Sequence, residues 1–171
     1  MLYYAFGSNM LNRRLQLRVP SADPVSKAVL PGYELKFHKQ SNTDGSGKCS
    51  IQKKEGSKMY GVVFEIDKDE KTLLDRAEGL GTGYEIREVE VQISGRPIEA
   101  FTYVATESHV DDSLRPFRWY KELVLAGAEQ HQLPEWYINQ IRQVEAVEDP
   151  NQKRRQNAED ILNHPSENGS K

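Results

Sequence analysis

Leu2-Tyr3-Tyr4-Ala5-Phe6-Gly7-Ser8-Asn9-Met10 stands at the start of the chain and decides the fold. Its apolar and aromatic beginning predicts a buried strand, followed by a turn and a helical pattern. Gly7 can adopt backbone conformations closed to other residues, and Ser8 or Asn9 can cap the helix through its side-chain oxygen. The N–H groups at such a helix start can bind an anion, or an oxygen that becomes negative in a reaction. A first strand and an ordinary capped helix would account for the same residues.

The composition indicates one domain without signs of a membrane or nucleic-acid partner. The chain has 171 residues, which suits one domain with a sizeable core, and a net charge of −3. This charge gives no reason to expect nucleic acid or an anionic membrane as a partner. No apolar run reaches the length of about 18 residues that a membrane span needs, and no basic region precedes the N-terminal apolar segment. With one cysteine, Cys49, no internal disulfide can form, and we expect a cytoplasmic protein.

Apolar and alternating segments after the opening stretch predict further strands. The segment 58–67 is almost continuously apolar, which is typical of a strand buried on both faces. Ser94-Gly95-Arg96-Pro97 predicts the turn of a hairpin. The strands expected beyond the first cover residues 26–38 (bent at Pro31-Gly32), 49–53, 58–67, 84–93 and 98–105.

Helical spacing of apolar residues predicts helices between and after the strands. They cover residues 67–77, 117–131, 134–147 and 152–163, with Asp67 as the cap of the first. Together these elements predict an α+β fold, a curved mixed β-sheet or small β-barrel of about six strands with flanking helices. We expect residues 1–150 to form this domain, and residues 151–171 to form a C-terminal helix and a partly disordered tail.

Metal and nucleotide sites are not indicated by the polar residues. The histidines His38, His109, His131 and His164 are scattered and, with one cysteine, match no zinc or iron spacing. Segment 45–48 is similar to part of a phosphate-binding loop, but the earlier glycine and the following hydroxyl residue are missing. Cys49 is either a nucleophile or a structural thiol, and the absence of a neighbouring histidine in the sequence favours the structural role.

Glu78 is a candidate acid/base residue. It stands at the end of a predicted helix, before a segment with three glycines at 79, 81 and 83 that can approach a ligand closely. The C-terminal end of a helix disfavours a carboxylate, so Glu78 in apolar surroundings would accept a proton readily, as a general base must. A solvated surface glutamate is the alternative interpretation.

Two segments together carry a resemblance to a known family: Tyr4-Ala5-Phe6-Gly7-Ser8-Asn9-Met10 and Asp75-Arg76-Ala77-Glu78-Gly79-Leu80-Gly81-Thr82-Gly83-Tyr84. In this order and spacing they resemble the gamma-glutamylcyclotransferase family. The resemblance extends over nearly the whole chain, through segments 20–22, 60–63 and 120–134. It implies the family's curved mixed sheet or small barrel, and an enzyme that releases 5-oxoproline from a gamma-glutamyl compound.

The resemblance also implies a set of site residues. Glu78 matches the family's acid/base residue, and Tyr120 matches a tyrosine of the late helix that lines the pocket. The first motif matches the substrate-binding loop, which falls on Tyr3, Tyr4, Ala5, Phe6, Gly7 and Ser8, with Asn9 supporting it. The chain departs from the family at Phe6, where a tyrosine is usual, so a phenol hydrogen bond is missing at this position.

The implied chemistry needs only what these residues supply. The substrate's own α-amine attacks its γ-carbonyl and closes a five-membered ring, so proximity carries much of the rate. Glu78 takes a proton from the ammonium and passes one to the departing amine. Backbone N–H groups of residues 7–9 stabilise the oxyanion. No metal or cofactor is required.

Two classes of function remain open from the sequence. The leading hypothesis is an enzyme, a gamma-glutamylcyclotransferase acting on a small gamma-glutamyl amino acid, peptide or amine. The alternative is a non-catalytic small-ligand-binding or interaction protein with the same fold. The presence of Glu78 favours the enzyme, because a binding protein has no need of it. The sequence identifies neither the leaving group nor the oligomeric state, with a homodimer among the alternatives.

Overall fold

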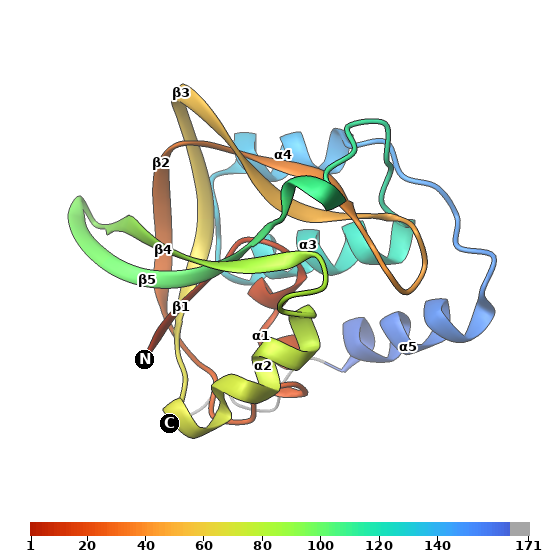
Figure 1. Ribbon diagram of the computed structural model, residues 1–171, viewed down its shortest axis with the longest axis horizontal. Helices are drawn as coiled ribbons and strands as arrows, with labels where there is room; N and C mark the ends of the chain where they lie inside the picture. Colours follow the sequence, from red (N-terminus) through yellow and green to blue (C-terminus); the bar gives the residue numbers. More distant parts are fainter. Residues whose placement is uncertain (165–171) are drawn as a thin grey trace.

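The strands of this protein wind into a closed barrel, seen in the computed structural model, which describes residues 1–164 (Figure 1). They pair in the order β1-β3-β2-β4-β5. β1 closes the barrel by pairing in parallel with β5 through Tyr3 and Phe101, while the other pairs are antiparallel. The strands are β1 (Leu2–Ala5), β2 (Asp23–Gln40), β3 (Gly47–Glu65), β4 (Tyr84–Ile93) and β5 (Arg96–Ala105).

The barrel has five strands, whereas the sequence pattern predicted about six. The predicted strands 49–53 and 58–67 are parts of one long strand, β3. Pro31 of β2 pairs with Lys58 of β3, and Tyr33 pairs with Lys53. The pairing register therefore shifts between these two pairs, in the part of β3 where Gly56 has a φ of 76°. Pairing resumes on both sides of this irregularity, which is why two predicted segments form one strand.

The segment after β1 differs from the predicted capped helix. A 3-10 turn, η1 (Ser8–Met10), leads into a helix of five residues, α1 (Asn12–Gln16). Neither receives a side-chain cap, because the cap positions fall on Gly7 and Leu11, whose side chains have no hydrogen-bond acceptor. The side chains of Ser8 and Asn9 bond elsewhere. The prediction of a side-chain N-cap is therefore wrong, and so short a helix offers little dipole to bind an anion.

Gly7 is required for space and not for an unusual backbone conformation. Its φ of −110° is open to any residue. A Cβ atom at this position would lie 2.9 Å from Cβ of Cys49 and 3.3 Å from the hydroxyl oxygen of Tyr120. The loop can approach strand β3 and the late helix this closely only with glycine.

The remaining helices follow the predicted segments with small shifts. They are η2 (Lys68–Glu70), α2 (Lys71–Glu78), α3 (Arg118–Gln130), α4 (Glu135–Gln143) and α5 (Gln152–Asn163). The short 3-10 helix η3 (Glu107–His109) lies where no helix was predicted. The side chain of Asp67 makes no cap bond, contrary to expectation. α4 ends before Val147, which instead pairs with Phe117. The predicted disordered tail falls on residues 165–171, outside the described part of the chain.

Helix α3 packs against the loop that follows β1 and holds it in place. A Cβ at Gly127 would lie 2.6 Å from the backbone nitrogen of Leu11, so α3 and this loop are in direct contact. α5 joins the same contact, since Ala158 packs with Leu11 and Leu123. Figure 1 shows α5 beyond α3, away from the barrel. None of the helices among residues 1–164 is long and apolar enough to cross a membrane.

Candidate active site

A small cavity of about 30 Å³ brings together residues from distant parts of the sequence. The loop after β1, the start of β3, the end of α2, strands β4 and β5, and helix α3 all contribute to its wall. The lining residues are Tyr3, Phe6, Gly7, Ser8, Asn9, Cys49, Glu78, Tyr84, Tyr103 and Tyr120. Most of the residues implied by the resemblance therefore lie around one space, Glu78 among them.

Glu78 is the last residue of α2, and the helix ends because Gly79 takes a left-handed conformation with φ of 68°. Oε1 of Glu78 accepts hydrogen bonds from Nδ2 of Asn9 and Nη1 of Arg18, each at 2.8 Å. Arg18 also donates to Oδ1 of Asn9 at 2.9 Å. In the described part of the chain, Oε2 of Glu78 has no hydrogen-bond partner, so it is available to a substrate.

These contacts differ from the surroundings that the sequence indicated for Glu78. The sequence pointed to a helix end and apolar neighbours, both unfavourable to a carboxylate. The structure adds the guanidinium of Arg18, which forms a partly buried ion pair with Glu78. This ion pair holds the Glu78 side chain in place at the wall of the cavity.

Asn9 links the loop to the aromatic wall of the cavity. Besides its bond to Glu78, Nδ2 donates to the hydroxyl oxygen of Tyr3 at 3.1 Å. Burial, and then the nearby charge of Glu78, raise the pKa of Tyr3 above its usual value. Tyr3 therefore stays a neutral phenol. The side chain of Asn9 is held by hydrogen bonds to Tyr3, Glu78 and Arg18.

Among residues 1–164, no hydrogen-bond acceptor is found for the backbone N–H groups of residues 7–9 in the turn after β1. Its hydrogen bonds use the N–H groups of Met10 and Leu11, which donate to the carbonyls of Gly7 and Ser8 at 3.0 and 3.3 Å. The N–H groups of residues 7–9 precede these bonds, at the position where a helical turn has no internal acceptors for them. Oγ of Ser8 accepts a hydrogen bond from Nε of Arg14 at 2.8 Å.

Tyr120 and Tyr84 hold the start of β3 against the cavity. The hydroxyl of Tyr120 accepts a hydrogen bond from the backbone nitrogen of Cys49 at 3.1 Å, and the hydroxyl of Tyr84 donates to the carbonyl of Cys49 at 2.7 Å. Burial raises the pKa of the Cys49 thiol to about 12. Cys49 is therefore a protonated thiol at neutral pH, which suits a structural role better than a nucleophilic one.

Tyr4 and Ala5, which the resemblance includes in the substrate loop, do not line the cavity. Both are fully buried in β1, where they pair with Val63 and Val62. The hydroxyl of Tyr4 donates to the carbonyl of Met59 at 3.3 Å. Alternation of side chains along the strand explains this for Tyr4, because Tyr3 faces the site while Tyr4 points to the opposite side.

Three residues of the site were not singled out in the sequence: Arg18, Tyr84 and Tyr103. The hydroxyl of Tyr103 donates to Oδ1 of Asp75 at 2.5 Å and so fixes one wall of the cavity. For Arg18, the available signal was its place four residues after Arg14 in a helical pattern, because such residues share a face of a helix. In the structure Arg18 lies in the turn after α1, which ends at Gln16. Tyr84 ends the second motif of the resemblance but was given no role, and nothing local to Tyr103 distinguishes it from an ordinary strand residue.

The small cavity adjoins a larger cleft of about 340 Å³. Ser8, Glu78, Tyr84 and Tyr120 line both spaces. The rest of the cleft wall comes from α1 and the turn after it, from β2, the segment 41–44 and the start of β3, from α2 and the segment after it, and from α3 and α5. A ligand that reaches Glu78 through the cleft can place one end in the small cavity and leave the other end in the cleft.

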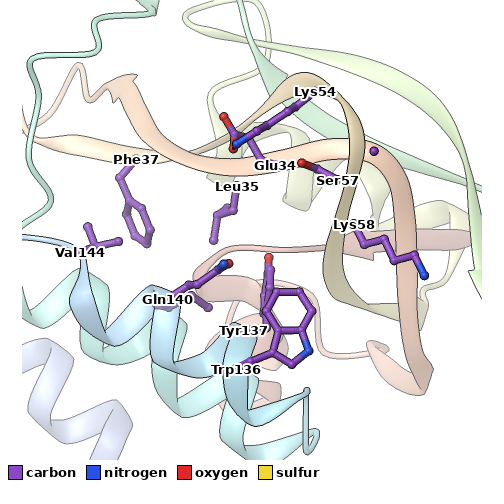
Figure 2. Close-up of a pocket in the computed structure, with 12 residues that line it drawn as sticks. Glu34, Leu35, Phe37, Lys54, Ser57, Lys58, Trp136, Tyr137, Gln140 and Val144 are labelled. Carbon is purple, nitrogen blue, oxygen red and sulfur yellow. The ribbon is translucent and has the colours of Figure 1, made fainter.

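A separate groove lies between the β2–β3 arm and helix α4 (Figure 2). Leu35 and Phe37 come from β2, and Trp136 and Tyr137 come from α4. Its carboxylate, Glu34, is paired with Lys36 and Lys54 near the surface. The groove contains none of the residues implied by the resemblance, so we place the candidate active site at Glu78.

Comparison with known proteins identifies the family. A bovine (Bos taurus) protein named gamma-glutamylcyclotransferase is 33% identical over 151 residues, which cover 84% of this chain and 78% of the relative. The chain belongs to the gamma-glutamylcyclotransferase family. The human (Homo sapiens) gamma-glutamylcyclotransferase is also 33% identical, over 150 residues and the same shares of the two chains.

The family's fold is also that of this chain. A solved structure of a gamma-glutamyl cyclotransferase superimposes with a TM-score of 0.84 at 29% identity, covering 95% of this chain and 98% of that chain. The model of the AIG2-like family matches residues 58–141, a range that includes Glu78 and Tyr120 but not the loop after β1. The resemblance inferred from the two motifs, the α+β fold and an enzyme of the gamma-glutamylcyclotransferase kind are therefore confirmed.

Proposed function

We propose that this protein cleaves a gamma-glutamyl compound by cyclisation, releasing 5-oxoproline and a free amine or amino acid. One observation carries the proposal: Glu78 has one oxygen held by Asn9 and Arg18 and the other without a partner in the described part of the chain. The family assignment supports an enzyme over a non-catalytic binding protein.

The substrate supplies both the nucleophile and the electrophile, so the site must hold the glutamyl group in a folded shape. The small cavity is too narrow for a whole glutamyl group, because a single water needs a cavity of about 10–15 Å³. The glutamyl group therefore occupies this cavity together with the adjoining end of the cleft. Tyr3, Tyr103 and Tyr120 form a rigid wall against which the chain of the substrate folds.

Glu78 acts as the acid/base residue through Oε2. It first accepts a proton from the α-ammonium group, which frees the amine to attack the γ-carbonyl carbon. After the C–N bond of the ring forms, the same oxygen gives this proton to the leaving nitrogen as the original C–N bond breaks. The ring nitrogen then loses its second proton to Glu78, which passes it to the freed amine, so the products are the neutral lactam and an ammonium group. Arg18 and Asn9 keep Oε1 fixed during both transfers.

Backbone N–H groups of residues 7–9 stabilise the oxyanion that develops on the γ-carbonyl oxygen. This role fits the site because the turn uses only the N–H groups that follow these residues. The reaction needs no redox change and only proton transfer. We propose that it proceeds without metal or cofactor, and that the protein, with its one buried cysteine, acts in the cytoplasm.

A panel of gamma-glutamyl amino acids, dipeptides and amines tests the proposal, with 5-oxoproline and free amine measured in parallel. We expect the two products in equal amounts. The matched control is the same compound with its α-amine acetylated, which cannot cyclise and should release nothing. Release of glutamate in place of 5-oxoproline, or turnover of the acetylated compound, would contradict cyclisation. Tight binding of these compounds without products would favour the non-catalytic alternative.

A further inference from the structure

The cleft beside Glu78 carries a strong excess of positive charge, although the whole chain has a net charge of −3. Six cationic side chains line it: Arg14, Arg18, Lys39, Lys48, Arg76 and Arg154. Two carboxylates line it, Asp44 and Glu78. A concave surface of one charge concentrates ligands of the opposite charge.

Half of these cations already have partners. Arg18 pairs with Glu78 at 2.8 Å, Lys48 with Asp44 at 3.0 Å, and Arg154 with Asp149 at 2.7 Å. The other three, Arg14, Lys39 and Arg76, have no carboxylate within ion-pair distance among residues 1–164. The unpaired positive charge of the cleft is therefore available to a ligand.

Lys39 is the most unusual of the unpaired cations. It is 6% exposed, and lysine is almost never buried to this extent without a partner. Its ammonium lies 4.5 Å from the centre of the Tyr84 ring and close to Gly83, and no hydrogen-bond acceptor in the described residues holds it. Burial lowers the pKa of Lys39, and an anion in the cleft would offset that cost.

Arg14 lies on the loop side of the cleft. Its Nε donates to Oγ of Ser8, which places the guanidinium beside the loop that we assign to the glutamyl group. Lys39 makes no hydrogen bond to this loop among the described residues, and its ammonium lies instead next to Gly83 and Tyr84. The two cations are therefore suited to different anionic groups of one ligand.

We propose that the preferred leaving group is an acidic amino acid, and that Lys39 is the specificity-determining residue that binds its side-chain carboxylate. This inference rests on the proposed function. A gamma-glutamyl dipeptide of this kind carries carboxylates on the glutamyl part, on the leaving α-carbon and on the leaving side chain. These three carboxylates equal in number the three cleft cations without a carboxylate partner among residues 1–164, Arg14, Lys39 and Arg76.

The test compares kcat/KM for gamma-glutamyl-glutamate and gamma-glutamyl-glutamine, which have nearly the same size and differ by one charge. We expect a preference of about tenfold or more for the glutamate compound, the usual worth of a charged hydrogen bond. Lys39→Met should abolish the preference, and Lys39→Arg should retain most of it. Lys58→Met, at an exposed lysine in the separate groove, is the matched control and should keep the full preference.

Equal use of the two compounds by the unaltered protein would overturn the assignment while leaving the cyclisation in place. A preference that survives Lys39→Met in a protein folded by circular dichroism would also overturn it. Absence of 5-oxoproline from every gamma-glutamyl compound would instead refute the proposed function, and this inference with it.

Discussion

At the scale of single residues, the central feature is that the two carboxylate oxygens of Glu78 have different surroundings. Asn9 and Arg18 both bind Oε1, so the carboxylate is fixed in orientation and still has one oxygen for proton transfer. A side chain that only paired with Arg18 for stability would gain more from using both oxygens, as a bidentate pair does.

We expect Glu78→Gln to abolish turnover while the fold is retained, because the amide keeps the size of the side chain but cannot accept the proton. Removal of a general base typically costs about 10²–10⁴ in rate. The measurement is 5-oxoproline release, with circular dichroism as the control for folding. Near-normal release by the purified variant would end the assignment of Glu78 as acid/base.

Gly7 is the second residue on which the site depends. Gly7→Val should lower kcat by about 10²–10³, because the added side chain displaces the loop and its N–H groups from the oxyanion. The physical reason is the distance of 2.9 Å that a Cβ would have to Cβ of Cys49. Ser8→Ala is the milder comparison, since it removes a hydroxyl and leaves the backbone in place. A folded and fully active Gly7→Val would show that the loop takes no part in catalysis.

At the scale of elements, Asp149 joins α5 to the start of α3. Its carboxylate accepts hydrogen bonds from Arg154 and from Nε1 of Trp119, while Asn151 caps α5 at the backbone nitrogen of Arg154. The hydrogen bonds from Arg154, against the opposing effect of burial, hold the pKa of Asp149 well below its usual value. Arg154 also lines the cleft, so this anchor links α5 to the site.

We expect Asp149→Asn to lower the free energy of unfolding by about 2 kcal/mol at neutral pH. Because the pKa of Asp149 is depressed in the folded state, its contribution is present above the ordinary aspartate pKa of about 3.9 and is lost as the pH falls below it. Urea unfolding at neutral and acidic pH measures this. Asp160→Asn, on the exposed side of α5, is the matched control. An equal difference at both pH values would argue against an ionic anchor.

At the scale of the whole molecule, the barrel, the loop after β1 and α3 enclose the candidate site, where the reaction that we propose needs only proton transfer. Among the described residues, no group of three or more His, Cys, Asp or Glu side chains is arranged to hold a metal ion. Exhaustive chelation should therefore leave 5-oxoproline release unchanged. Activity that is lost on chelation and restored by one particular metal would contradict the cofactor-free mechanism.

Local sequence determined the elements whose stability is local. The two-residue turn at Ser94-Gly95, with φ of 50° and 79°, and helix α5 at residues 152–163 formed where they were predicted, because turn chemistry and helical spacing act between near neighbours. The two motifs also sufficed to indicate the family, and they identified Glu78 and the loop after β1 as candidate site residues.

Only the tertiary structure decided how these candidates are used. Arg18 meets Glu78 across 60 residues of sequence, and Gly7 is needed because Cys49 and Tyr120 crowd it from other elements. The predicted strands 49–53 and 58–67 became one strand because β2 pairs with both of them. The charge of the cleft likewise arises from lysines and arginines of separate elements. Such contacts depend on how the barrel closes, and no pattern of neighbouring residues contains that information.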